Sequence, residues 1–203
     1  MPARFLRSLA AGVLLALTFP STAAAEWHFV PTIGWTFQAD TSIFDPDEGT
    51  SKVHWNFGGT VTLLGSGILG VEGMFVWTPG FFQNDESLGH PPLVSKSHTI
   101  AMMGNAVLTT PRQWTEYGLR PFVSGGLGAL RVSRTDVTFP GTANIPAFNI
   151  GGGAIGFLSK RTGVRFDLRY YNNLTPSEDT CPTTIGQCHL RYMTFTAGVV
   201  IRR

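Results

Sequence analysis

The chain is short of charged residues and of long apolar runs. Asp, Glu, Lys and Arg together make up 14% of the 203 residues, whereas about 25% is usual in soluble domains. Beyond residue 25, no apolar run reaches the ~18 residues that a membrane-spanning helix needs. No segment has the periodicity of an amphipathic helix either. If the mature chain meets a membrane, it must therefore do so with strands.

The mature chain also lacks an excess of charge of either sign. All 13 acidic residues lie after residue 25, whereas two of the 15 basic residues, Arg4 and Arg7, lie before it. The formal net charge of +2 therefore comes from the leader, and 13 basic residues face 13 acidic ones in the remainder. This balance gives no reason to expect a nucleic-acid partner.

Cysteine is scarce as well, since only Cys181 and Cys188 occur, in a polar segment. In an exported protein this spacing predicts a local disulfide. Two free thiols or a lone metal-binding pair are the alternatives. Closing so short a loop stabilises a fold by only ~2 kcal/mol on the chain-entropy model. We therefore expect the disulfide to stiffen a loop and not to hold the fold together.

The first 25 residues have the parts of a secretory signal peptide. Arg4 and Arg7 precede the apolar run LAAGVLLALTF, and small residues follow as far as Ala25. A membrane anchor is the alternative, but the run is too short to span a bilayer. We predict that residues 1–25 are removed before Glu26 and that residues 26–203 form a single domain.

The mature chain is rich in alternation of apolar and polar residues, which is typical of strands with two unlike faces. In TGVRFDLRYYNNL, residues 162–174, every second residue from Val164 to Tyr170 is apolar or aromatic. The glycine-rich segments near 125 and 152 do not reveal their faces. We expect eight strands, at about residues 27–38, 52–64, 68–78, 98–109, 119–132, 148–158, 162–174 and 192–201.

The connections between these segments alternate in length. Short connections lie at 65–67, 110–118 and 159–163. Long polar connections lie at 39–51, 79–97, 134–146 and 173–189. Long loops at one end and short turns at the other are the pattern of an outer-membrane barrel. The sequence therefore predicts an all-β fold, an eight-stranded antiparallel up-and-down transmembrane β-barrel over residues 26–203, with both termini on the short-turn side.

A soluble lipocalin-like carrier would place the apolar face inside such a barrel, whereas a membrane barrel places it outside. The polar face here consists mainly of Gly, Thr, Ser and Asn, and not of the Lys and Glu of a water-exposed exterior. The interior of an eight-stranded barrel is only wide enough for side chains to fill it. The apolar face also carries aromatic residues toward the strand ends, as an interfacial girdle requires. These predicted girdle residues are Trp27, Phe37, Trp55, Trp77 and Tyr170.

With the apolar face outward, four charged residues point into the lumen. Arg165, Asp167 and Arg169 lie on one face of the seventh segment, and Glu72 lies on the inner face of the third. Two arginines balance two carboxylates, and buried charges must be paired. We interpret these four residues as a lumenal salt-bridge network that plugs the barrel. The alternative is that some of them reach the aqueous rim.

Several segments resemble the OmpA-like family of small outer-membrane barrels, over residues 27–201. The resemblance rests on LRPFVSGGLGALRV at 119–132, FNIGGGAIGFLSKRTGVRFDLRYY at 148–171 and the closing amphipathic strand. It implies a monomeric protein of the bacterial outer membrane that contacts outer-membrane lipid and lipopolysaccharide. It also implies insertion by the barrel-assembly machinery, although Arg202 and Arg203 replace the usual aromatic ending. Glu72, Arg165 and Arg169 resemble the inward charges with which such barrels close their lumen.

No catalytic, cofactor or metal site is predicted. Lipid A deacylases, which are barrels of similar size, carry a His and a Ser near the outer end of a late strand, where this chain has Tyr170 and Asn172. His28 and His54 are candidate cross-strand neighbours in the lumen, but two imidazoles alone are typical of polar filling.

We therefore expect a non-enzymatic protein that serves envelope structure or contacts an unidentified extracellular partner through its long loops, chiefly 79–97 and 173–189. The main alternative is a channel for small solutes or hydrophobic compounds. A lipid A-modifying enzyme and a periplasmic lipocalin-like carrier rank below it.

Overall fold

The computed structural model describes residues 26–41, 53–65, 67–81, 96–111, 118–135, 141–174 and 190–203. Among these residues no helix is long and apolar enough to span a membrane. The strands are β1 (Glu26–Thr41), β2 (His54–Leu64), β3 (Leu69–Pro79), β4 (Lys96–Thr109), β5 (Leu119–Thr135), β6 (Gly141–Phe157), β7 (Thr162–Asn173) and β8 (Leu190–Arg202). The predicted signal peptide and the predicted disulfide between Cys181 and Cys188 lie outside the described residues, so both stay predictions.

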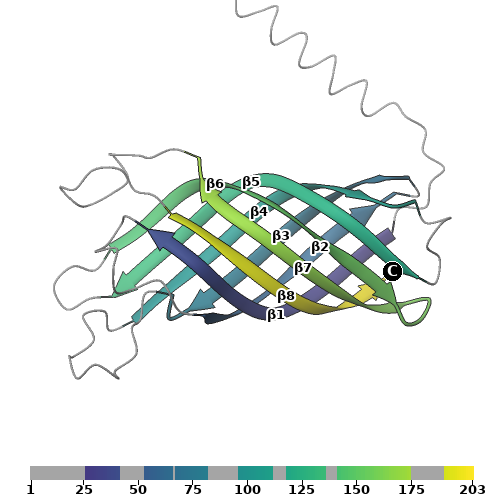
Figure 1. Cartoon of the computed structure of the whole chain (residues 1–203), viewed down its shortest axis with the longest axis horizontal. Helices are drawn as coiled ribbons and strands as arrows, with labels where there is room; N and C mark the ends of the chain where they lie inside the picture. The colour runs from purple at the N-terminus through teal and green to yellow at the C-terminus, as the bar shows by residue number, and fades with distance from the viewer. Residues whose placement is uncertain are drawn as a thin grey trace, which may run out of the picture.

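Each strand pairs antiparallel with the next along the chain, and β8 pairs with β1, which closes the sheet into a barrel (Figure 1). The expected eight-stranded antiparallel up-and-down barrel is confirmed. The start of β1 and the end of β8 lie together, since the Trp27 amide donates to the Arg203 carbonyl oxygen at 3.1 Å. We call this end, which also holds the connections 65–68, 110–118 and 158–161, the short-turn end, and the opposite end the long-loop end.

Alternation along the strands separates the side chains into an outer and an inner set. In β7, Phe166 and Leu168 are exposed on the outer surface, and the charged residues that alternate with them are buried in the interior. The apolar faces expected for the other strands also point outward. Examples from these strands are Phe29, Phe57, Val71, Met102 and Val199.

The structure corrects one expectation about β5 and β6 and answers one question that the sequence left open. The long polar connection expected at 134–146 is wrong, because β5 continues to Thr135 and β6 begins at Gly141. Thr142 and Asn144 are exposed on this extension, and Ile145 and Ala147 are buried. An outward face that is polar near the long-loop end hides the strand from a search for apolar alternation. The glycine-rich faces are resolved too: Phe122 and Ile155 point inward.

Candidate functional site

Two strands bring four charged side chains to the middle of the barrel interior. Arg165, Asp167 and Arg169 occupy alternate positions of β7, so all three point inward. Glu72 points inward from β3, where it lies opposite Asn105 of β4. We call these four residues the charged layer. Each of them is at most 4% exposed, so none of the four reaches the aqueous rim.

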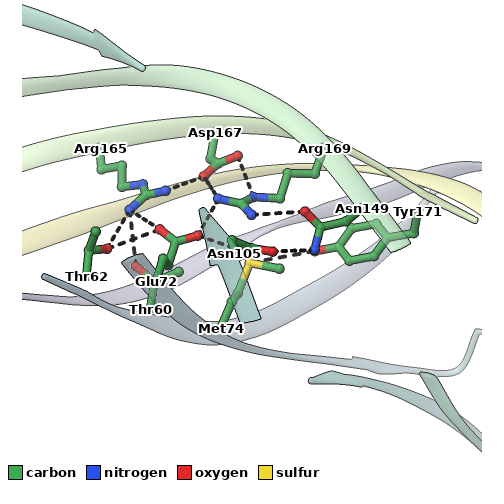
Figure 2. Close-up of polar contacts among 10 residues, drawn as sticks. All are labelled: Thr60, Thr62, Glu72, Met74, Asn105, Asn149, Arg165, Asp167, Arg169 and Tyr171. Atoms are coloured by element: carbon green, nitrogen blue, oxygen red, sulfur yellow. Dashed lines mark hydrogen bonds and ion pairs between the residues drawn. The ribbon is translucent and has the colours of Figure 1, made fainter. Parts of the chain in front are cut away.

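The charged layer is joined by a continuous set of ion pairs (Figure 2). Arg165 Nη1 lies 2.6 Å from Glu72 Oε2, and Arg169 Nη2 lies 2.7 Å from Glu72 Oε1. The same two arginines bind Asp167 Oδ2, at 2.7 Å and 2.8 Å. Arg169 Nε adds a second bond to Asp167 Oδ1 at 2.8 Å, so this pair has the two-point geometry that suits a guanidinium and a carboxylate.

Neutral side chains from other strands satisfy further atoms of the charged layer. Thr62 donates to Glu72 Oε2 at 3.1 Å, and the Asn105 amide donates to Glu72 Oε1 at 2.9 Å. Asn149 donates to Asn105 Oδ1 at 2.7 Å and accepts from Arg169 at 3.3 Å. The network therefore joins β2, β3, β4, β6 and β7 across the interior. Such bonds matter because buried charges are costly unless they are both paired and hydrogen-bonded.

Asn105 and Asn149 were not recognised from the sequence as part of the site. Asn105 lies in the expected fourth strand and Asn149 in a glycine-rich one, and nothing in either segment marks an amide as a partner of Glu72. The strand register alone brings them together, since Asn105 lies opposite Glu72 and both asparagines lie opposite Gly126 of β5. A prediction of register from turn positions is the only signal that would have found them.

The remainder of the interior is not uniformly polar, which corrects the expectation of a polar lumen. Apolar clusters lie on both sides of the charged layer. The short-turn cluster consists of Val30, Leu64, Val107, Phe122, Ile155 and Val200. The long-loop cluster consists of Ala39, Met74, Val76, Phe81, Ala101, Met103, Leu130, Val132, Ile145, Ala147, Tyr171, Leu190 and Tyr192. The sequence hides them because inward Met74 and Val76 alternate with outward Phe75 and Trp77, which reads as one apolar run.

A specific contact ties the short-turn cluster to the charged layer, and other contacts hold the long-loop cluster together. On the short-turn side, the Arg165 guanidinium carbon lies 4.3 Å from the centre of the Phe122 ring, within the range of a cation–π contact. On the long-loop side, the Tyr171 hydroxyl donates to the Met74 sulfur at 3.7 Å, and its ring stacks on Tyr192 at 4.8 Å. The charged layer therefore lies between two apolar clusters, and further buried polar side chains, such as the hydrogen-bonded Thr36, Asn56 and Thr78, also line the interior.

The five predicted girdle residues point outward. Trp27, Trp55 and Trp77 are exposed, and Phe37 and Tyr170 are half-buried. Phe37 lies just before a β-bulge in which Gln38 has a φ of 50°. Trp27 lies near the short-turn end and the other four nearer the long-loop end. Their role at a membrane interface stays a prediction.

The two histidines are not neighbours, so the expected cross-strand pair is wrong. His28 lies opposite Thr62, near the short-turn end, whereas His54 lies opposite Thr36, toward the long-loop end. The register of β1 and β2 separates them by most of the strand length. Among the described residues, no group of three or more His, Cys, Asp or Glu side chains is placed to hold a metal ion.

Comparison with solved structures finds the same barrel in several proteins. Neisserial surface protein A is 10% identical, with a TM-score of 0.58, over 88% of this chain and 98% of that chain. The outer membrane protein OprG from Pseudomonas aeruginosa is 11% identical, with a TM-score of 0.59, over 89% of this chain and 97% of that chain. Ail of Yersinia pestis, in complex with the heparin analogue sucrose octasulfate, is 13% identical, with a TM-score of 0.53, over 88% of this chain and 98% of that chain.

No protein-family model matches the sequence, and no curated protein matches it. At identities of 10–13%, likeness between structures shows the fold. The chain therefore has the fold of the small eight-stranded outer-membrane barrels, as its resemblance to the OmpA-like family implied.

Proposed function

We propose that this protein is a non-enzymatic integral protein of the bacterial outer membrane, with a sealed interior and with its working parts in the loops of the long-loop end. The observation that carries the proposal is the inverted distribution of side chains. Apolar side chains cover the outside of the barrel, and two ion-paired arginines and two carboxylates lie inside it. Water around this exterior would be strongly unfavourable, whereas lipid suits it.

The apolar exterior extends around the whole barrel. Every strand contributes at least one large exposed apolar side chain, and β1, β2 and β3 each contribute an aromatic residue. Monomeric soluble proteins rarely expose contiguous apolar patches of more than a few hundred Å². An apolar surface on all sides therefore supports a transmembrane barrel over a lipocalin-like carrier, which would keep these side chains inside.

The filled interior supports a closed barrel. The charged layer spans the lumen from β3 to β7, and apolar clusters lie above and below it. An ion crossing this interior would have to displace the paired charges and pass the side chains that fill the barrel on both sides of them. We infer that the charged layer and the two apolar clusters together seal the barrel.

The absence of catalysis in the proposal rests on two positions of β7. A deacylase of this fold needs a nucleophile and a base near the outer end of a late strand. Tyr170 and Asn172 occupy that part of β7 here, and Tyr170 lies on the outer face. A phenol and an amide at these places supply neither group of a Ser–His pair.

Two roles then remain, which are contact with the surroundings through the loops and support of the envelope by the barrel. The fold is compatible with contact, since a protein named for attachment, Ail, was solved with a heparin analogue. A strain that lacks the gene, complemented with a variant whose connection 82–95 is replaced by a short Gly-Ser linker, separates the two roles. Both roles predict that the shortened variant restores resistance to detergent. Only a contact role predicts that the shortened variant fails to restore attachment.

The channel for hydrophobic compounds is the second candidate, because the long-loop cluster is more apolar than a polar lumen would be. Recordings from planar bilayers test it. A sealed barrel shows no unit conductance and no uptake of a lipophilic dye into proteoliposomes. Stepwise conductance from wild-type protein would contradict the seal, and dye uptake without conductance would favour a hydrophobic path.

A further inference from the structure

Basic side chains gather at one place on the short-turn end. Lys160 and Arg161 belong to the turn between β6 and β7, Arg202 ends β8, and Arg203 follows it. We call these four residues the basic rim cluster. Together with Ile201 they line a pocket of about 640 Å³ that is open to the surroundings. The turn between β2 and β3, by contrast, carries no charged residue.

The backbone holds the basic rim cluster in place. Ser159 Oγ accepts hydrogen bonds from the amides of Arg161 and Thr162, at 3.2 and 3.0 Å. The Arg202 amide donates to the Arg161 carbonyl oxygen at 2.8 Å, which ties the turn to β8. A rigid backbone reduces the ordering cost that a binding site pays.

Most of the positive charge in the basic rim cluster is unbalanced. Arg202 Nε lies 3.4 Å from Glu26 Oε2, and its guanidinium lies over the Phe157 ring. Lys160, Arg161 and Arg203 have no ion-pair partner among the residues that the structure describes. Lys160, Arg161 and Arg203 are also exposed. The pocket therefore offers positive charge to an anion from outside the chain.

The same pocket borders the apolar exterior. Ile201 is 51% exposed and lies opposite Phe29 of β1. Val199, two residues earlier in β8, is the next outward-facing side chain toward the middle of the barrel. Trp27 stacks on Phe29 at 6.3 Å, beside the end of β8. A group of cations, an aromatic side chain and an apolar wall thus follow one another from the rim toward the middle of the barrel.

We propose that the basic rim cluster binds the headgroup phosphate of an anionic phospholipid, with an acyl chain along Ile201 and Val199. The ligand must carry both a negative charge and a hydrocarbon chain, because the pocket joins cations to an apolar wall. Basic side chains near a membrane surface each favour anionic lipids. The inference rests on the proposed membrane insertion and places the site in the leaflet on the short-turn side.

Native mass spectrometry of the folded barrel with phosphatidylglycerol or phosphatidylcholine tests the proposal. We expect the first phosphatidylglycerol to bind roughly tenfold or more tightly than phosphatidylcholine, because each basic residue raises the affinity for an anionic lipid about fivefold. The double variant Lys160→Gln/Arg161→Gln should lose that preference, and Arg203→Gln should lose part of it. High salt should weaken the preference in the wild type.

Arg131→Gln is the matched control, because Arg131 is an exposed basic residue of β5 toward the opposite end, and it should keep the wild-type preference. Equal affinity for both lipids, or a preference that survives the double variant, would overturn the inference. Displacement of phosphatidylglycerol by glycerol 3-phosphate would overturn it in favour of a soluble anion. A barrel that inserts into vesicles but shows no preference overturns only this inference, whereas failure to insert overturns the proposed function as well.

Discussion

Arg169 on β7 and Glu72 on β3 form an ion pair of 2.7 Å across the barrel, although 97 residues separate them in the sequence. The two strands are not neighbours in the sheet. The pair therefore forms only when the barrel is closed, and it connects opposite walls through the lumen. Asp167 holds the same guanidinium from its own strand, so the loss of either carboxylate leaves a buried arginine with half of its partners.

The first prediction concerns the removal of one charge from this layer. Glu72→Gln should lower the free energy of unfolding by ~3–5 kcal/mol, because it leaves positive charge buried without compensation. Urea unfolding of the barrel refolded in lipid vesicles measures this loss. The double variant Glu72→Gln/Arg169→Gln should lose less than the sum of the two single variants. Strict additivity would show that the two groups do not act as a pair.

The second prediction tests what surrounds the barrel. Leu168 lies near the middle of β7 on the outer face and is 44% exposed. In a bilayer, Leu168→Arg should lower the free energy of unfolding by ~2–4 kcal/mol, because the lipid-facing charge destabilises the folded barrel. Leu158→Arg is the control, because Leu158 lies in the β6–β7 turn and is 76% exposed. Urea titrations of both variants in vesicles should separate them. Equal, small effects would mean that the outer face of the barrel meets water.

The third prediction concerns a close approach between β1 and β8. A Cβ atom added at Gly34 would lie 1.9 Å from the Phe195 carbonyl oxygen, so the two strands would have to move apart. Gly34→Ala should destabilise the barrel by ~1–3 kcal/mol, as overpacking usually does. At Gly73 an added Cβ meets nothing within 4 Å, and Gly73→Ala should be tolerated. The midpoint of thermal unfolding, read from the gel-mobility shift, compares the two. A tolerated Gly34→Ala would show that the seam is looser than the structure has it.

The sequence predicted the barrel because strands that separate lipid from a polar interior must alternate. From Val164 to Arg169 of β7 the alternation is strict, and it placed Arg165 and Asp167 on the inner face. It failed where side chains carry no contrast. Glycines at 151–153 have no Cβ to mark a face, and the extension of β6 has polar residues outside and apolar ones inside.

The candidate site was only partly predictable for a related reason. Charge balance indicated which residues need partners, but partners on other strands depend on register. Asn105 and Asn149 lie close to Glu72 and Arg169 because β3 pairs with β4, β4 pairs with β5, and β5 pairs with β6. The apolar clusters of the interior were hidden too, because Met74, which points inward, is as apolar as the outward-facing residues near it in the sequence.

Gel mobility of the protein from outer-membrane fractions, boiled and unboiled, tests the central claim most directly. A closed barrel with a paired charged layer and a lipid-facing exterior should resist detergent until it is heated. We predict that the protein is found in the outer-membrane fraction and that its band shifts on boiling. A protein found soluble in the periplasm, with the same mobility before and after boiling, would contradict the account and favour a lipocalin-like carrier.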